Sequence, residues 1–260
     1  MNKVFSLLTA AVLGIGLLPV HAQFSPPAAG SAADDVMTKV FGDKLNFSAD
    51  LETQVKIMPK QDIITMSGKI YFSGGNSRSE MDMTSMKGSQ MTPEVIEQMK
   101  SMGMDKMVSI SRASEKMVYM VYPSLQAYAK MELPDAKKFA TNDFKVETTK
   151  LGEETVDGHT CVKIQYTINN TGTGQRLIMT AWNATDLKNI PVKIEQSAWS
   201  STESYGGTST TMHFLNINQS QPAASLFQPP SDYKKYDDIQ TMMQTEMMKK
   251  MGGMGRPPGR

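Results

Sequence analysis

Thioethers are the side chains with the most distinctive chemistry in this sequence, because 23 of its 260 residues are methionine. Thioether sulfur prefers soft metals such as Cu(I), and it also reacts with oxidants. Methionine equally replaces leucine in a core, or lines a surface that adapts to lipid tails. The sequence leaves these interpretations open. The candidate ligands for a copper site are Met242, Met243, Met247 and Met248.

Histidine and cysteine, the other soft-metal ligands, are scarce. His159 and Cys161 stand two residues apart, so on an extended strand they would share a face. Two ligands do not complete a zinc site. We therefore expect a histidine at a strand end, a thiol packed in the interior and, at His213, a side chain that faces solvent. Apart from the copper alternative at the tail methionines, the sequence predicts no metal and no other cofactor.

Catalytic signatures are missing from the sequence. It contains no Gly-x-Ser-x-Gly, no His-Glu-x-x-His, no phosphate-binding glycine loop and no Gly-x-Gly-x-x-Gly after a strand. Acidic residues are scattered over many segments, which leaves catalysis by carboxylates alone open. The pattern favours a protein that is not an enzyme.

The elements that must position these residues are mainly strands. Apolar and polar residues alternate from Phe47 to Ile57 and again from Ile64 to Phe72, which is typical of strands with one wet face. About ten such segments with short links predict a mainly β (α+β) fold, in which a curved antiparallel sheet forms an unclosed barrel. The further segments are 106–112, 117–122, 127–133, 144–151, 160–168, 176–182, 192–199 and 208–216.

One helix is predicted between the strands, with Thr92 as N-cap, Pro93 in the first turn and Gly103 at the end. Its apolar stripe must cover something, and on a curved sheet the available surface is the concave opening. We therefore expect this helix to act as a lid over a cavity, which aromatic residues of the strands would help to line. The candidate lid and cavity residues are Val95, Ile96, Met99, Met102, Tyr119 and Trp182.

The two ends of the chain differ in kind from its middle. An apolar run over residues 4–20 follows Lys3, and Val20-His21-Ala22 is a small-x-small pattern, so residues 1–22 are predicted to be a signal peptide cleaved after Ala22. Gln23 follows where a lipid anchor would need cysteine, so we expect a product released into the periplasm or secreted. No later segment is predicted to insert stably into a membrane.

Charge and composition divide the processed chain further. Loss of Lys3 leaves 26 basic and 26 acidic residues, and this balance argues against a nucleic-acid partner. Residues 23–42 are expected to form a flexible leader with a short helix, and 43–236 the domain. Residues 237–260 are expected to form a methionine-rich helix with a disordered end over 252–260. A helix this short must dock, either on its own barrel or on a protein partner.

Four motifs in order resemble the exported DUF4412 family, which is similar to the periplasmic lipoprotein-carrier (LolA-like) fold. They are Met117-Val-Tyr-Met-Val-Tyr-Pro123 with Tyr128, Leu151-Gly-Glu-Glu-Thr-Val-Asp-Gly-His-Thr-Cys-Val-Lys163, Ala181-Trp182 with Leu187 and Ile190-Pro-Val-Lys193, and Leu226-Phe-Gln-Pro-Pro-Ser-Asp-Tyr233. The resemblance spans about residues 43–236. It implies an unclosed barrel with helices over its opening and an apolar cavity, which in the carriers takes acyl chains.

Three hypotheses follow. The leading one is a non-catalytic envelope protein that binds a hydrophobic partner, either an acyl chain or a lipidated molecule, in the concave face of a half-barrel. The second is a methionine-based copper-binding or oxidant-scavenging protein. The third is a structural assembly module that pairs with a protein partner through its tail.

Overall fold

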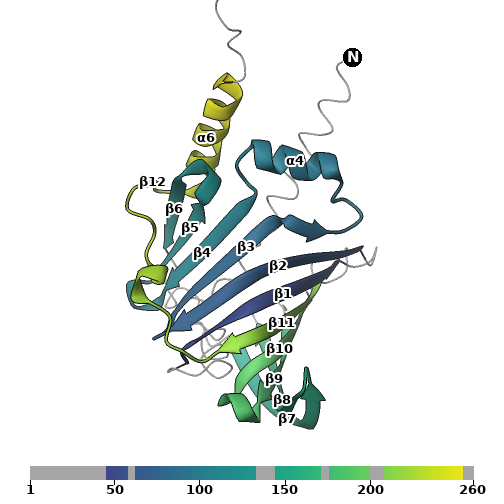
Figure 1. Ribbon diagram of the computed structural model, residues 1–260. Coiled ribbons are helices and arrows are strands. Elements are labelled where there is room, and N and C mark those ends of the chain that lie inside the picture. Colours follow the sequence, from purple (N-terminus) through teal and green to yellow (C-terminus); the bar gives the residue numbers. More distant parts are fainter. Residues whose placement is uncertain (1–44, 58–61, 133–143, 171–175, 200–207, 254–260) are drawn as a thin grey trace, which may run out of the picture.

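The computed structural model describes residues 45–57, 62–132, 144–170, 176–199 and 208–253. Strands dominate this part of the chain, and two α-helices accompany them (Figure 1). The strands are β1 (Phe47–Ile57), β2 (Asp62–Ser73), β3 (Asn76–Lys87), β4 (Lys106–Arg112), β5 (Met117–Tyr122), β6 (Ala127–Glu132), β7 (Phe144–Val156), β8 (His159–Asn170), β9 (Arg176–Ala184), β10 (Ile190–Trp199), β11 (Thr208–Asn218) and β12 (Lys234–Tyr236). The helices are α4 (Pro93–Ser101) and α6 (Ile239–Gly253), with short 3-10 turns η1 (Ala113–Glu115), η2 (Pro123–Leu125), η3 (Thr185–Leu187) and η4 (Ala224–Phe227).

All twelve strands form one open sheet in the order β12-β6-β5-β4-β3-β2-β1-β11-β10-β9-β8-β7. Neighbouring strands are antiparallel, except that β12 pairs with β6 in parallel. The sheet does not close, because β7 and β12 stand at opposite edges of this order. The expected mainly β, unclosed half-barrel is therefore confirmed.

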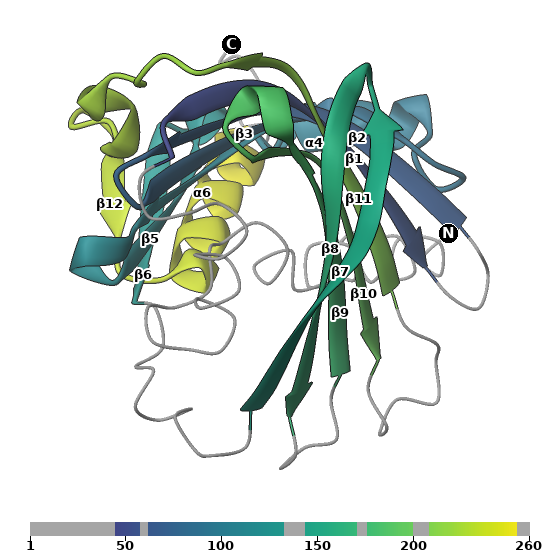
Figure 2. The same ribbon diagram turned by 90° about the horizontal axis from the view of Figure 1, so that it is seen from below.

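β-Bulges bend the sheet. The pairing register shifts between Ser48 and Asp50 on β1, between Thr65 and Ser67 on β2, and between Lys150 and Gly152 on β7. An extra residue on one strand increases its local twist and bends the ladder. Figure 2 shows the result, a sheet that arches over α6, so the face towards α6 is the concave one.

The concave face is nearly uncharged. Directly paired residues of antiparallel strands lie on the same face, so the register assigns every inward position from one strand to the next. From β1 to β6 and from β8 to β11, the one charge at an inward position of the described strands is Asp62, which pairs with Ile57 at the very start of β2. Charged residues such as Glu52, Lys69 and Lys163 occupy the outward positions. Charged residues are thus almost confined to the convex face, as the alternation in β1 predicted.

Two strands were missed by the sequence prediction. β12 is only three residues long, and β3 carries serine at the inward positions Ser77 and Ser79. Serine in these positions hides the apolar–polar alternation that reveals a strand.

The signal peptide, the leader helix and the end of the tail beyond Gly253 lie outside the described residues. The helix α6 itself extends past residue 252, where the sequence predicted that disorder begins.

No helix within the described segments has both the length and the apolar character needed to cross a membrane.

Candidate ligand-binding surface

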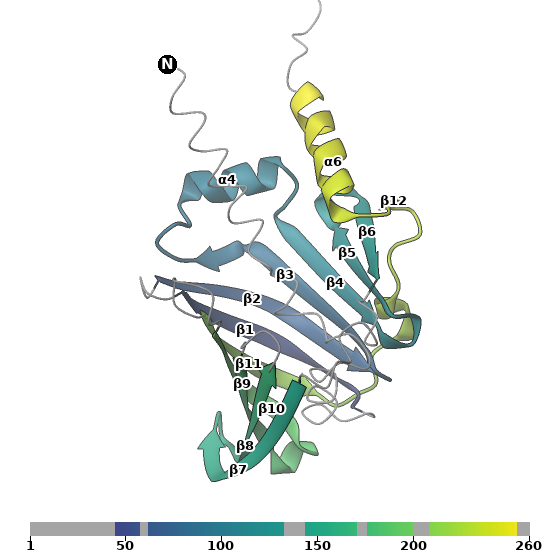
Figure 3. The same ribbon diagram turned by 180° about the vertical axis from the view of Figure 1, so that it is seen from behind.

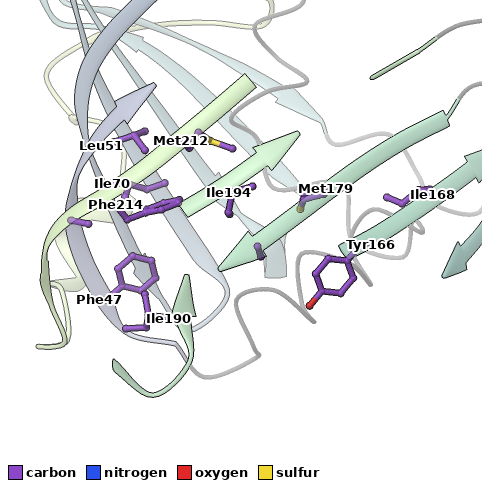
Figure 4. Packing of buried hydrophobic residues seen from close by; sticks show 12 residues of the cluster. Phe47, Leu51, Ile70, Tyr166, Ile168, Met179, Ile190, Ile194, Met212 and Phe214 are labelled. Atoms are coloured by element: carbon purple, nitrogen blue, oxygen red, sulfur yellow. The ribbon is translucent and has the colours of Figure 1, made fainter. Parts of the chain in front are cut away.

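The largest group of packed side chains covers the concave face of β1, β2 and β8–β11, and we call it the Phe47 cluster. Phe47, Leu51 and Ile194 within it are 0–1% exposed. Figure 4 shows side chains of this group along one side of the strands. The two described α-helices make their principal contacts elsewhere, α4 with β3 and α6 with β6 and β12. The cluster comprises Phe47, Ala49, Leu51, Ile70, Tyr166, Ile168, Met179, Ala181, Ile190, Ile194, Met212 and Phe214.

A second group covers the concave face of β3–β6, and α6 packs onto it. Met242 of α6 is 0% exposed here. We call this group the methionine cluster, because methionines of the sheet and of α6 make up much of it. Its buried members are Met81, Met107, Val118, Met120, Tyr122, Ala127, Ala129, Tyr236 and Met242, with Met66, Met83, Met104, Leu125, Met131, Ile239 and Met243 packed against them.

A polar link fixes α6 to the sheet. The Tyr236 hydroxyl donates a short hydrogen bond to Oε1 of Glu246, and Nζ of Lys249 lies 2.6 Å from the same oxygen. Glu246 is 8% exposed. Its burial works to raise its pKa, but the hydrogen bonds from Lys249 and Tyr236 outweigh burial and lower the pKa. The tail helix therefore docks on its own sheet, the first of the two alternatives that the sequence left open.

The tail methionines do not gather into one site. Met242 is fully buried, whereas Met248 is 67% exposed. Met243 and Met247 are half-buried. Met242 and Glu246, one turn apart, are the residues that α6 buries most. The four proposed copper ligands thus lie at different depths around the helix, and Met242 and Met243 pack in the methionine cluster.

The predicted helix α4 lies at the rim of the sheet, above the last part of β3 and the upper end of β4 in Figures 1 and 3. Thr92 caps it, since the Thr92 hydroxyl accepts a hydrogen bond from the Val95 backbone at 3.4 Å. Met99 is 9% exposed, and Val95, Ile96 and Met102 are half-buried. These four candidate lid residues are therefore carried by a helix that contacts β3.

Tyr119 and Trp182 occupy the convex face, so neither lines the concave one as the sequence analysis expected. Tyr119 alternates with the inward residues Val118 and Met120, and its ring meets Tyr128 edge to face. Trp182 alternates with the inward Ala181. The period of two places neighbours in a strand on opposite faces, and only the register fixes which neighbour points inward.

Both aromatic residues have structural partners on the convex face. Tyr119 joins a cluster beneath η4, which Arg78 holds through a 3.0 Å hydrogen bond to the Leu226 carbonyl. Trp182 is 2% exposed, with the amines of Lys163 and Lys193 at 4.6 and 4.4 Å from the ring centroid. Cation–π contacts of this kind hold a ring in place without a ligand.

The two described histidines and the cysteine fill structural positions. Nδ1 of His159 lies 2.8 Å from Asp186, and Nδ1 of His213 lies 3.1 Å from Asp157. Cys161 is 0% exposed, and burial raises the pKa of its thiol. Within the described residues, no three His, Cys, Asp or Glu side chains come together as a metal site would require.

Serines that the sequence analysis did not single out lie between the two clusters. Ser77 and Ser79 of β3 pair with Ser111 and Ser109 of β4, and all four side chains point inward. They are 1–7% exposed. We call them the serine patch. The only sequence signal for it is the serine spacing at i and i+2 on two segments, and this spacing predicts a shared strand face once both segments are assigned as strands.

A shallow hollow of about 410 Å³ lies away from this surface, at the edge of the sheet where β6 meets the start of α6. Its lining is Lys130, Met131, Glu132, Asp237 and Asp238. Charged side chains dominate this lining, and a salt bridge of 3.2 Å joins Lys130 to Asp237 across it. Four of the five lining residues carry a charge, so a hydrophobic ligand in this hollow would lie beside charged groups.

Several solved structures match the chain at low identity. The lipoprotein LppX of Mycobacterium tuberculosis matches with 10% identity and a TM-score of 0.40, over 73% of this chain and 96% of that one. A DUF1329 family protein from Desulfovibrio piger matches with 15% identity and a TM-score of 0.33, over 78% and 98%. The MucA/MucB complex of Pseudomonas aeruginosa matches with 11% identity and a TM-score of 0.39, over 77% and 62%.

No match was found among curated proteins. A family model does match, described as "Domain of unknown function (DUF4412)", and it covers residues 52–191. This span runs from β1 into β10 and so includes most strands of the concave face. It is also more than half of the chain. The chain therefore belongs to the DUF4412 family, as its four sequence motifs predicted.

Proposed function

We propose that this protein is a non-catalytic, exported binding protein of the cell envelope that holds the acyl chain of a lipid or lipidated partner against the Phe47 cluster. The observation that carries the proposal is the nearly uncharged concave face, which runs across β1–β6 and β8–β11, while charged residues other than Asp62 at the start of β2 stay on the other side of the sheet. An apolar ligand on such a surface loses no hydrogen bonds and meets no unpaired charge.

Hydrophobic burial supplies the affinity in this proposal. Each methylene removed from water contributes about 0.8 kcal/mol, so a chain of ten buried methylenes gains roughly 8 kcal/mol before the costs of association. A curved floor buries more of the chain than a flat one. The Phe47 cluster is the half of the concave face on which neither described helix makes its principal contacts, and it is therefore the proposed floor.

The helix α4 is the proposed lid. It stands at the rim next to β3, and its apolar residues Val95, Ile96, Met99 and Met102 would close over a bound chain. Release would follow when the helix moves and a better acceptor covers the same apolar surface. In this proposal the lid controls the rate of dissociation, whereas the floor controls affinity.

Two neighbouring residues on opposite faces of β9 test the proposed floor. Leu177 packs against the Phe47 cluster, and Ile178 points outward, yet both are half-buried. Leu177→Gln places an amide on the floor, where we expect about tenfold weaker binding of a fluorescent fatty acid. Ile178→Gln makes the same kind of change on the convex face and should leave binding unchanged.

Native mass spectrometry of the exported protein completes the test. The proposal expects a bound lipid mass in the wild type and less of it in Leu177→Gln. Equal binding by the two variants would indicate that the ligand does not bind on the concave face. A wild type that carries no lipid and binds no fluorescent fatty acid would refute the proposed function.

A further inference from the structure

The serine patch interrupts an otherwise mainly apolar surface at a defined place. On one side Ser77 and Ser79 pair with Phe72 and Ile70 of β2, next to the Phe47 cluster. On the other side the two serines of β4 pair with inward residues of β5 that belong to the methionine cluster. Four hydroxyls thus lie along the boundary between the two apolar regions.

Two of these hydroxyls are buried without a partner. The Oγ atoms of Ser79 and Ser111 have no hydrogen-bond partner among the described residues, and the side chains are 4% and 1% exposed. On the same face, Oγ1 of Thr53 is also buried and unpaired. A buried hydroxyl without a partner costs about as much as a lost hydrogen bond. These hydroxyls therefore need an acceptor that the described residues do not supply.

A ligand carbonyl would satisfy them. A serine hydroxyl can donate one hydrogen bond, and the carbonyl oxygen of an ester or amide can accept two. A free carboxylate or a phosphate would instead bring a charge onto a face that offers no inward cation on β1–β6. A plain hydrocarbon would leave the hydroxyls unpaired.

We infer that the serine patch binds the carbonyl group of an acyl ester or acyl amide whose hydrocarbon chain lies on the Phe47 cluster. This inference rests on the proposed function and narrows its ligand to a linked acyl chain. The polar group sits at β3 and β4 and fixes the position of the ligand, while the chain crosses β2 and β1. Both an ester lipid and an acylated peptide carry this chemistry.

The matched probes are 1-palmitoyl lysophosphatidylcholine and its 1-O-hexadecyl ether analogue, which differ at the carbonyl. Their affinities are measured by displacement of a fluorescent fatty acid. We expect the wild type to bind the ester roughly fivefold more tightly than the ether, the value of about one hydrogen bond. A peptide with an O-palmitoyl serine and the same peptide with an O-hexadecyl serine form the second pair, and whichever carbonyl probe shows the larger preference identifies the source.

The decisive variant is S79A/S111A. Because it removes hydroxyls that are unpaired in the free protein, we expect its Tm to rise by about 2–4 °C. Its preference for the carbonyl probes should fall to about one, with binding of the ether unchanged. Stability and selectivity would thus change in opposite directions, which general damage to the fold does not produce.

Ser73→Ala is the matched control, because Ser73 of β2 is 9% exposed and its hydroxyl donates to Oδ1 of Asn46 at 2.8 Å. It should lower the Tm and leave the carbonyl preference intact. A wild type that binds ester and ether equally overturns the inference but not the proposed function, and so does a preference that survives S79A/S111A. A wild type that binds neither probe of either pair overturns both.

Discussion

The two halves of the concave face differ in what packs on their apolar side chains. Over β3–β6 the chain covers itself, because α6 seats Met242 among the sheet methionines. Over β1, β2 and β8–β11 the floor holds ring and branched side chains such as Phe47, Leu51 and Phe214, onto which neither described helix principally packs. Flexible methionines let a helix with an irregular surface fit closely, whereas stiffer side chains preserve the shape of a floor.

This difference gives the methionines a role that needs no metal. Those of α6 and of β3–β5 meet one another across the joint between helix and sheet. Their unbranched side chains can fill irregular gaps without a fixed shape. The sequence drew attention to them for their sulfur chemistry, but their placement in the fold is that of packing residues. The comparison between the two halves then predicts which variants affect stability and which affect binding.

The largest effect is expected at Met242, which is the most deeply buried residue of α6. Met242→Ala should lower the free energy of unfolding by about 2–5 kcal/mol, because it removes buried methylenes and leaves a cavity under the helix. Urea denaturation followed by circular dichroism measures this change. Met248→Ala is the control, since Met248 is 67% exposed and its loss should cost less than about 0.5 kcal/mol.

The same pair of variants separates the two halves. If α6 only covers its own half, Met242→Ala should leave the affinity for a fluorescent fatty acid unchanged. A large loss of affinity would mean that the two halves act as one surface. Equal destabilisation by the two alanine substitutions would contradict the buried position of Met242.

A smaller effect is expected from Tyr236→Phe, which removes the hydroxyl that donates to Glu246. Glu246 would keep Lys249 but lose a hydrogen bond inside the joint, so we expect a loss of about 1–3 kcal/mol at pH 7. Tyr236 is 8% exposed, so the phenyl ring should still pack. Denaturation at neutral pH measures the difference between the variant and the wild type.

The contribution of this contact to stability depends on pH. The pKa of Glu246 is lowered in the folded protein from its ordinary value of 4.5, so its charge stabilises the fold above that pH. This stabilisation is lost as the pH falls below about 4.5 and through the lowered folded value. The gap between wild type and Tyr236→Phe should therefore narrow between pH 7 and pH 3.5, and a gap that widens would show that Glu246 is not the titrating partner.

The sequence predicted the strands better than the faces they present. Alternation located β1 and β2 because their inward positions are apolar, but it missed β3, whose inward Ser77 and Ser79 look like surface residues. It also identified Tyr119 and Trp182 as residues that could line a cavity, although they point to the convex face. The face of the sheet on which a side chain lies depends on the register between strands that are far apart in sequence, such as β1 and β11. No local sequence pattern contains that information.

The ends of α4 were predictable for the opposite reason. Thr92, Pro93 and Gly103 act through their own backbone and their nearest neighbours, so the chain carries the whole signal locally. The serine patch, in contrast, has almost no local sequence signal. It exists only because β3 pairs with β4 across the α4 insertion, and its unpaired hydroxyls become visible only when both strands are buried.

The smallest effect is expected at Gly103, where α4 ends at the rim of the proposed ligand floor. The Gly103 N–H donates to the Lys100 carbonyl and the Met104 N–H donates to the Met99 carbonyl, both at 2.9 Å, which is the hydrogen-bond pattern of a Schellman motif. Gly103 has a φ of +75°, and an added Cβ would meet Cδ2 of Leu125 at 2.5 Å. Because the tip of Leu125 can shift, most of the cost is the left-handed backbone, about 1 kcal/mol.

Gly103→Ala should therefore loosen the end of α4 without undocking α6. If α4 closes over the Phe47 cluster, the variant releases a fluorescent fatty acid faster than the wild type in a stopped-flow chase, while the change in its urea midpoint stays small. Lys100→Ala is the matched control, because it removes only the exposed ion pair with Glu97 and leaves the motif intact. Equal dissociation rates for wild type and Gly103→Ala would show that α4 does not control ligand release and therefore does not act as a lid at the rim of the concave face.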